Sequence, residues 1–189
     1  MRLKGIDISH HNKHQFISNQ LDFNKQDFII VKATEGKSFV DPMWDEYMGV
    51  IDSLGKPYGL YHYARPENND AIAEAKYFIN TIKKDGEKGI LVLDWEGKAT
   101  TFDIQWAIDW MNYVEHYYGK KPLIYCSSWY TKKLKPVLAN GNGLWVAHYT
   151  KANKPAIYTY PFYTIWQYSS SPYDKDIFNG DLSQWLKYT

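Results

Sequence analysis

Two carboxylates follow an apolar run near the middle of the chain. Residues 90–96 read Ile-Leu-Val-Leu-Asp-Trp-Glu, so one residue separates Asp94 from Glu96. Side chains alternate between the faces of a β-strand, which puts both acids on one face with Cα atoms roughly 6.5–7 Å apart. Such a pair favours a protonated acid beside an ionised partner, the combination that glycoside hydrolysis uses. The alternative is a strand end with two solvated or salt-bridged acids.

Short apolar segments that could position these acids recur about every 20–30 residues along the chain. The unbroken run before Asp94 is typical of a strand buried on both faces in a parallel sheet, and α/β folds bind ligands at the carboxyl ends of such strands. An eighth, edge element could lie within 176–182. The other predicted strands are 4–9, 28–34, 58–64, 90–96, 123–128, 144–149 and 163–169.

Helical patterns separate the early strands. We predict helices over 42–54, with Asp41 and Pro42 as N-cap and first residue and Gly55 at the end; over 70–84, ended by Gly86; over 103–118, ended by Gly119; and a weaker one over 129–138, limited by Pro136. After residue 139 the helices drop out. A full (β/α)₈ barrel needs about 250 residues. The pattern therefore predicts one domain, 1–189, with an irregular TIM-like β/α barrel that lacks helices in its C-terminal part.

In a barrel, the carboxyl ends of the strands meet at one mouth. Asp7 lies between two isoleucines, where an acid needs a partner or a purpose. Asp181 would follow the eighth strand and bring a fourth acid to Asp7, Asp94 and Glu96. The other strand ends contribute polar and aromatic side chains: Ser9, Lys32, Glu35, Tyr61, Tyr63, Tyr125, Ser127, His148, Tyr149, Gln167 and Tyr168.

Composition and motifs exclude several other classes. A formal net charge of +1 argues against a nucleic-acid partner. The histidines at 10, 11 and 14 lack the spacing of a tetrahedral metal site, and neither a G-x-S-x-G elbow nor a phosphate-binding glycine loop occurs, so we expect neither metal nor cofactor. The N-terminus lacks the apolar run of a secretory signal, and no 18-residue apolar stretch could span a membrane. We expect synthesis in the cytoplasm without a signal peptide.

Nine segments, taken in order, resemble the glycoside hydrolase family 25 lysozymes, N-acetylmuramidases of bacterial and phage origin. They cover nearly the whole chain. The segments are Gly-Ile-Asp-Ile-Ser (5–9), Val-Lys-Ala-Thr-Glu-Gly (31–36), Asp-Pro (41–42), Gly-Leu-Tyr-His-Tyr (59–63), Leu-Asp-Trp-Glu (93–96), Pro-Leu-Ile-Tyr (122–125), Leu-Trp-Val-Ala-His-Tyr (144–149), Trp-Gln-Tyr-Ser (166–169) and Gly-Asp-Leu (180–182).

The resemblance implies an irregular barrel of eight strands and five helices that hydrolyses the β-1,4 bond between N-acetylmuramic acid and N-acetylglucosamine in peptidoglycan. It implies Glu96 as general acid, Asp94 as its close partner, and Asp7 and Asp181 as the rest of the acidic cluster. Further candidates for substrate binding are Lys32, Glu35, Tyr61, Tyr125, Trp145 and Gln167; the aromatic ones could instead pack in the core. Many relatives carry an aromatic where His10-His11-Asn12 stands here, and many append wall-binding repeats. We expect a monomer, with glycan strands as its partner and no membrane.

The resemblance also implies a mechanism, and two alternative functions remain beside it. Glu96 would protonate the glycosidic oxygen and later activate water, while Asp94 would assist the 2-acetamido group of the substrate; whether the reaction retains or inverts the anomer stays open. A chitinase-like hydrolase usually has acids two and four residues upstream, where Val92 and Ile90 stand here. A non-catalytic sugar-binding barrel is the other alternative. The enzyme would act on the cell wall after phage or prophage lysis, or after unconventional export.

Overall fold

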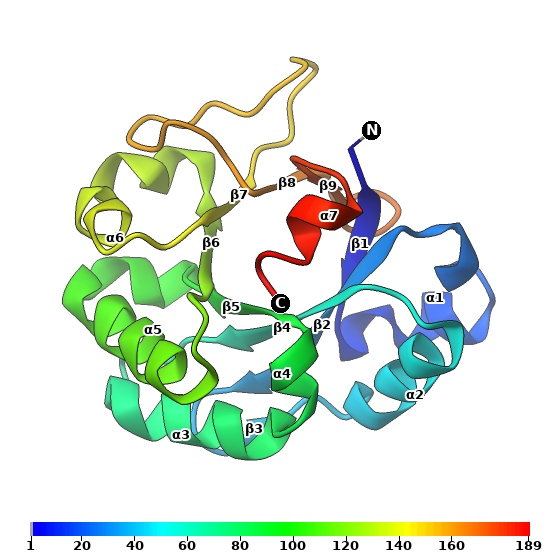
Figure 1. Cartoon of the computed structure of the whole chain (residues 1–189), viewed down its shortest axis with the longest axis horizontal. Coiled ribbons are helices and arrows are strands. Elements are labelled where there is room, and N and C mark those ends of the chain that lie inside the picture. Colours follow the sequence, from blue (N-terminus) through cyan, green and yellow to red (C-terminus); the bar gives the residue numbers. More distant parts are fainter. Residues whose placement is uncertain (1) are drawn as a thin grey trace.

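The computed structural model describes residues 2–189 and has a closed barrel at its centre (Figure 1). The barrel closes because β1 pairs with both β2 and β9. Around the ring follow β1 (Lys4–Ile8), β2 (Phe28–Glu35), β4 (Tyr58–Tyr63), β5 (Ile90–Asp94), β6 (Leu123–Ser127), β7 (Leu144–Ala147), β8 (Ile165–Ser169) and β9 (Lys175–Phe178). The two-residue β3 (Phe39–Val40) pairs only with the end of β2. The predicted barrel of eight strands is confirmed.

The last strand runs against its neighbours. β1, β2 and β4 to β8 are mutually parallel, whereas β9 is antiparallel to both β8 and β1. Only residues 170–174 connect β8 to β9, and so short a connection permits a hairpin but no parallel crossover. The N-terminal end of β9 therefore lies at the mouth, and its C-terminal end lies at the opposite end of the barrel.

The helices surround the barrel unevenly. The three long ones are α2 (Trp44–Leu54), α3 (Ala71–Ile82) and α5 (Ile104–Tyr118), all in the first two thirds of the chain. The short ones are α1 (Lys13–Ile17), α4 (Asp85–Lys88), α6 (Lys135–Ala139) and α7 (Leu182–Trp185). Within the described chain, residues 148–164 form a loop without helix, as expected for the C-terminal part. No helix over residues 2–189 has the length and apolar character that a membrane crossing requires.

Both predicted ends of α5 and the predicted end of α2 at Gly55 are confirmed, but the predicted start of α2 and the predicted end of α3 are not. Asp103 caps α5 by accepting from the N–H of Gln105, and Gly119 ends it at φ 72°. α2 begins at Trp44 rather than 42, because the Asp41 carboxylate binds the N–H of Met43 in a preceding turn. α3 ends at Ile82, and Gly86 lies inside the next short helix, α4.

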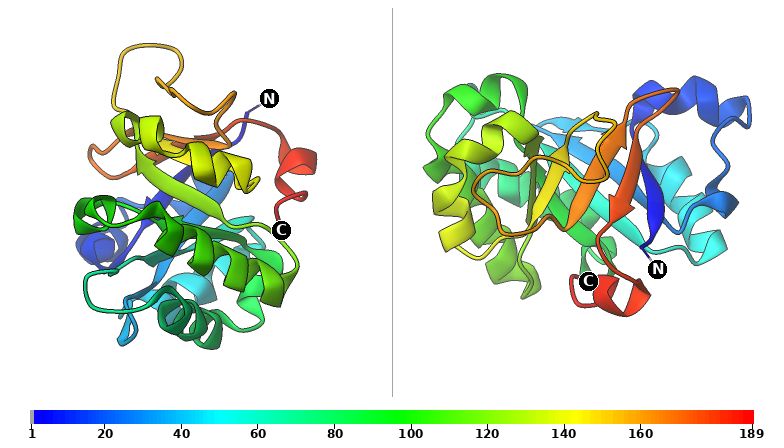
Figure 2. Two further views of the ribbon diagram at one scale, coloured as in Figure 1. Left: turned by 90° about the vertical axis from the view of Figure 1, so that its left-hand side faces the viewer. Right: turned by 90° about the horizontal axis from the view of Figure 1, so that it is seen from above.

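The core has two parts. One lies between the strands and the surrounding helices; the other fills the barrel and includes Phe28, Val92 and Phe178. The helix α7 lies across one end of the barrel (Figures 1 and 2), where buried Trp185 packs with ring centroids 4.7 Å from Phe28 and 5.1 Å from Phe178. That end is closed, so a ligand can reach the barrel axis only from the mouth.

Candidate active site

The mouth holds a pocket of about 300 Å³. It unites side chains from strands that are far apart in the sequence, including seven of the ten predicted site residues. Its lining consists of Asp7, Ser9, His11, Asn12, Tyr61, Asp94, Glu96, Tyr125, Trp145, Tyr149, Gln167 and Asp174. The predicted residues that do not line it are Lys32, Glu35 and Asp181.

Asp94 and Glu96 stand together in this pocket, as the alternation along β5 requires. Asp94 is buried, and its Oδ1 finds no hydrogen-bond partner among residues 2–189. Burial, and then the charge of Glu96, raise the pKa of Asp94 well above its usual range. Burial also raises the pKa of Glu96, and the ammonium of Lys32 opposes this rise. Two neighbouring carboxyls with raised pKa values favour a pair that holds one proton.

A second pair of neighbouring acids consists of Asp7 on β1 and Asp176 on β9. Asp7 accepts a hydrogen bond from Nε2 of Gln167 at 2.8 Å, and Gln167 Oε1 accepts from the hydroxyls of Tyr125 and Tyr149 at 3.0 and 2.6 Å. Burial, and then the charge of Asp174, raise the pKa of Asp7 to about 7. Asp176 is buried beside Asp7 and accepts from Nε1 of Trp145 at 2.9 Å. Burial raises the pKa of Asp176 well above its usual range, and the charge of Asp7 adds to this.

Asp7 should make stability depend on pH. Its pKa rises from 3.8 to about 7 on folding, so the folded protein binds more protons between these values and the free energy of unfolding falls as pH rises from about 4 to about 7. Within that window the free energy of unfolding falls by about 1.4 kcal/mol for each pH unit. Above about pH 7, Asp7 is ionised in both states and adds no further pH dependence. Asp7→Asn should therefore reduce the fall, as measured by urea unfolding midpoints between pH 4 and pH 8.

The matched control is Asp45→Asn, which changes an exposed aspartate on α2. We expect it to leave the pH dependence as in the unmodified protein. Asp176 stays in the Asp7→Asn variant, so the slope should shrink without vanishing. An unchanged slope in Asp7→Asn would mean that Asp7 is already ionised at acidic pH.

Asp181 does not join the acidic cluster, and the prediction that it does is wrong. It is exposed at the start of α7, where its Oδ1 accepts from the N–H of Gln184 at 3.0 Å and from the hydroxyl of Ser183 at 2.6 Å. Because β9 is antiparallel, residues after it lie at the closed end of the barrel, whereas Asp174 and Asp176, before and at its start, lie at the mouth. The five-residue connection before β9 was the signal that could have revealed this.

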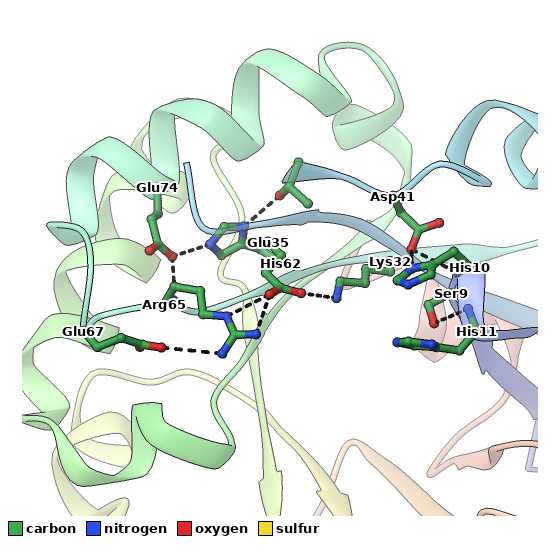
Figure 3. A network of polar contacts seen from close by, with 11 residues as sticks. Ser9, His10, His11, Lys32, Glu35, Asp41, His62, Arg65, Glu67 and Glu74 are labelled. Atoms are coloured by element: carbon green, nitrogen blue, oxygen red, sulfur yellow. Dashed lines mark hydrogen bonds and ion pairs between the residues drawn. The ribbon is translucent and has the colours of Figure 1, made fainter. Parts of the chain in front are cut away.

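Lys32 and Glu35 lie beside the acidic pocket and belong to a chain of ion pairs (Figure 3). Nζ of Lys32 is 2.6 Å from Glu35 Oε2, while Glu35 Oε1 accepts from Nε of Arg65 at 2.8 Å. Glu35 and Arg65 line a separate hollow of about 540 Å³, which His11 also borders. The buried ammonium of Lys32 acts on Asp94 and Glu96 through its charge, which opposes the rise of both pKa values that burial causes.

A buried histidine, His62, and a buried glutamate, Glu74, support the chain of ion pairs. His62 contacts Glu74 Oε2 through Nε2 at 2.8 Å and the Thr34 hydroxyl through Nδ1 at 2.7 Å. Glu74 also accepts from the backbone N–H of Arg65 at 3.1 Å (Figure 3). The ring of His62 is therefore fully engaged in holding the turn that carries Arg65, and burial lowers its pKa.

Trp145 lines the pocket but is only 2% exposed. Its ring lies 4.6 Å from that of Tyr125, centroid to centroid, and its N–H is used by Asp176. The prediction that Trp145 could stack on a sugar is therefore not favoured, because no free ring face is left. Tyr61 and Tyr125 also border the pocket.

Comparison with known proteins gives consistent results. The model of glycosyl hydrolases family 25 matches residues 6–177. The chain is 30% identical to a lysozyme of Streptococcus phage Cp-7 over 188 residues, covering 91% of this chain and 52% of the relative. It is 27% identical to an N,O-diacetylmuramidase of Chalaropsis sp over 188 residues, covering 89% of each. The structure of a muramidase from Acremonium alcalophilum superposes with a TM-score of 0.80 at 25% identity, covering 99% of this chain and 98% of that one.

Proposed function

Because the chain belongs to glycosyl hydrolases family 25 and is therefore a glycoside hydrolase of the lysozyme type, we propose that it cleaves peptidoglycan between N-acetylmuramic acid and N-acetylglucosamine, with Glu96 as general acid and base. The observation that carries the residue assignment is the pair of carboxyls with raised pKa, Asp94 and Glu96, in a pocket at the carboxyl ends of parallel strands. Hydrolysis of a glycosidic bond needs one protonated and one ionised carboxyl at such a place.

The position of Glu96 suits the acid role. It borders the acidic pocket and also an adjoining hollow of about 510 Å³ that contains neither Asp7 nor Asp94. A bond between two sugars, one in each hollow, would pass beside Glu96. The carboxyl is half-buried, and burial raises its pKa, which keeps its proton available for the departing glycosidic oxygen.

Asp94 suits the role of a helper to the substrate. Asp94 is buried more completely than Glu96, so it competes for the shared proton. An acetamido N–H that donates to the unpartnered Oδ1 would favour ionised Asp94 and leave the proton on Glu96. Substrate binding would in this way set the protonation state that the reaction needs.

The steps follow from these positions. The acetamido oxygen attacks the anomeric carbon while Glu96 gives its proton to the leaving oxygen, and Asp94 stabilises the positive charge that develops on the acetamido nitrogen. Ionised Glu96 then takes a proton from water, whose oxygen bonds to the anomeric carbon and releases the acetamido oxygen. Two displacements at one carbon retain the β configuration.

We expect digestion of purified peptidoglycan to leave N-acetylmuramic acid at every new reducing end. After borohydride reduction, mass spectrometry should detect muramitol-terminated muropeptides, and NMR during the reaction should detect the β anomer first. Reducing ends on N-acetylglucosamine would identify a different bond, and an initial α anomer would exclude the acetamido route.

Two controls address the alternatives. Release of reducing ends from chitin as fast as from peptidoglycan would favour the chitinase-like reading. Firm binding to cell walls without cleavage at any pH would favour the sugar-binding barrel.

The setting is also part of the proposal. We propose that the chain acts as a monomer on glycan strands and meets them after phage or prophage lysis, or after unconventional export. The similarity to a lysozyme of a Streptococcus phage favours lysis.

A further inference from the structure

The hollow beside the acidic pocket continues the cleft toward an aromatic surface. It shares Glu96, Tyr125 and Tyr149 with the acidic pocket and extends from there to Trp129 and Tyr158. Because the two hollows have three walls in common, a linear ligand in one can pass directly into the other. The continuation has about 510 Å³ of space, against about 300 Å³ in the acidic pocket.

The two aromatic side chains are unusually exposed, at 62% for Trp129 and 57% for Tyr158. Trp129 belongs to the short helix Ser128–Lys133 after β6, and Tyr158 belongs to the loop after β7. Hydrogen bonds tie these segments together: the hydroxyl of Ser128 donates to the carbonyl of Ala156 at 2.6 Å, and the N–H of Tyr158 donates to the Thr131 hydroxyl at 3.1 Å. The rings of Trp129 and Tyr158 therefore project from two segments that are held together by hydrogen bonds.

Two lysines accompany these rings. Nζ of Lys132 lies 4.4 Å from the ring centroid of Tyr158 and 5.9 Å from that of Trp129, and Nζ of Lys133 lies 5.8 Å from that of Trp129. Within residues 2–189, neither ammonium has a carboxylate at ion-pair distance. Trp129, Tyr158, Lys132 and Lys133, which we call the Trp129 platform, therefore offer aromatic faces together with two cations that lack an acidic partner.

The position of the acids gives the cleft a direction. Asp94 borders only the acidic pocket, whereas Glu96 borders both hollows. The sugar whose acetamido group reacts must lie beside Asp94, so the leaving sugar lies across Glu96, on the side of the Trp129 platform. On a peptidoglycan strand the next residue on that side is an N-acetylmuramic acid, whose peptide stem carries carboxylates.

We propose that the Trp129 platform binds the leaving-group side of the glycan strand, with Trp129 and Tyr158 against sugar rings and Lys132 and Lys133 against carboxylates of the peptide stem. The inference rests on the proposed function, because it takes the direction of the strand from the roles of Asp94 and Glu96. Aromatic faces suit the apolar faces of sugars, and lysines beside the rings suit an acidic substituent. The platform would make the enzyme prefer glycan that still carries its peptides.

The aromatic part can be tested by binding. Calorimetric titration should use a soluble, peptide-bearing glycan of four or more sugars and a chain with Glu96→Gln, so that the ligand stays intact. Trp129→Ala should weaken binding about tenfold, which corresponds to about 1.4 kcal/mol. Trp129→Phe, which keeps an aromatic face, should recover most of it. The control is Tyr117→Ala on α5, because Tyr117 is also 62% exposed; equal binding by Trp129→Ala and this control would overturn the assignment.

The lysine part needs two ligands. Lys132→Met with Lys133→Met should weaken binding of peptide-bearing glycan about fivefold or more and leave binding of the same glycan without peptides unchanged. The control is Lys187→Met, an exposed lysine after α7 at the closed end of the barrel. Equal losses for both ligands, or none for either, would overturn the role of the peptide stem. Failure of the proposed function would look different, because the unmodified chain would then bind the glycan without cleaving it.

Discussion

Replacing Glu96 by glutamine should lower kcat on peptidoglycan by about 10²–10⁴-fold, the range that general acid catalysis contributes. Glutamine keeps the size and polarity of the side chain but cannot deliver a proton to the glycosidic oxygen. The side chain is half-buried at the edge of the pocket, so the fold should tolerate the change. Release of reducing ends measures the activity, and thermal unfolding should give the same Tm as the unmodified protein.

The leaving group offers a sharper version of this test. A glycoside whose aryl leaving group departs without protonation should lose far less rate in Glu96→Gln than peptidoglycan does. The matched control is Glu46→Gln, an exposed glutamate on α2, which should be fully active. Substantial cleavage of peptidoglycan by Glu96→Gln would remove Glu96 from the acid role.

Asp94→Asn should cost a comparable factor in kcat with little change in KM, because the two carboxyls act as one unit. The amide keeps the shape of the side chain at the end of β5 but cannot carry the negative charge that would face the acetamido group. Initial rates on soluble peptidoglycan fragments separate kcat from KM. A rise in KM at constant kcat would instead make Asp94 a binding residue.

De-N-acetylated glycan provides the control for the acetamido route. The unmodified enzyme should cleave it slowly, and Asp94→Asn should add little further loss, since the group that Asp94 assists is already absent. Asp109→Asn, an exposed aspartate on α5, should behave as the unmodified enzyme on both substrates. Equal losses from Asp94→Asn on acetylated and de-N-acetylated glycan would argue that Asp94 acts on the sugar ring itself.

Most of the barrel could be predicted because its strands are short apolar segments separated by helices with clear caps. The parallel strands begin where predicted, except that β8 begins at Ile165 rather than at residue 163. Strand alternation then brought Asp94 and Glu96 into one pocket with Asp7, Tyr61, Tyr125 and Gln167. These residues lie at or near the carboxyl ends of parallel strands, so their positions in the sequence predict the end of the barrel on which they lie.

The wrong predictions concern residues whose place depends on the direction of a strand or on contacts between distant parts of the chain. Hydrophobic periodicity does not reveal the direction of a strand. Because β9 is antiparallel, Asp174 and Asp176 lie at the mouth, where Asp181 had been predicted. Lys32 lies on β2 in register with Tyr61 on β4, yet it is not part of the pocket lining; its ammonium pairs with Glu35 and acts on Asp94 and Glu96 through its charge. The sequence allows Trp145 to stack on a sugar, but its ring packs against Tyr125 and its N–H donates to Asp176, contacts that only the structure shows.

The hydrogen bond between Gln167 and Asp7 spans 160 residues of sequence, and Asp176 reaches the same cluster from the final strand. Closing a loop of this length costs conformational entropy before the contact contributes any stabilisation. A nascent chain that ends before residue 174 would already contain Asp94 and Glu96 but would have neither Asp174 nor a closed ring of strands. The ring of strands, and with it the pocket that unites Asp7 with Asp174, can therefore form only after β9 has been synthesised.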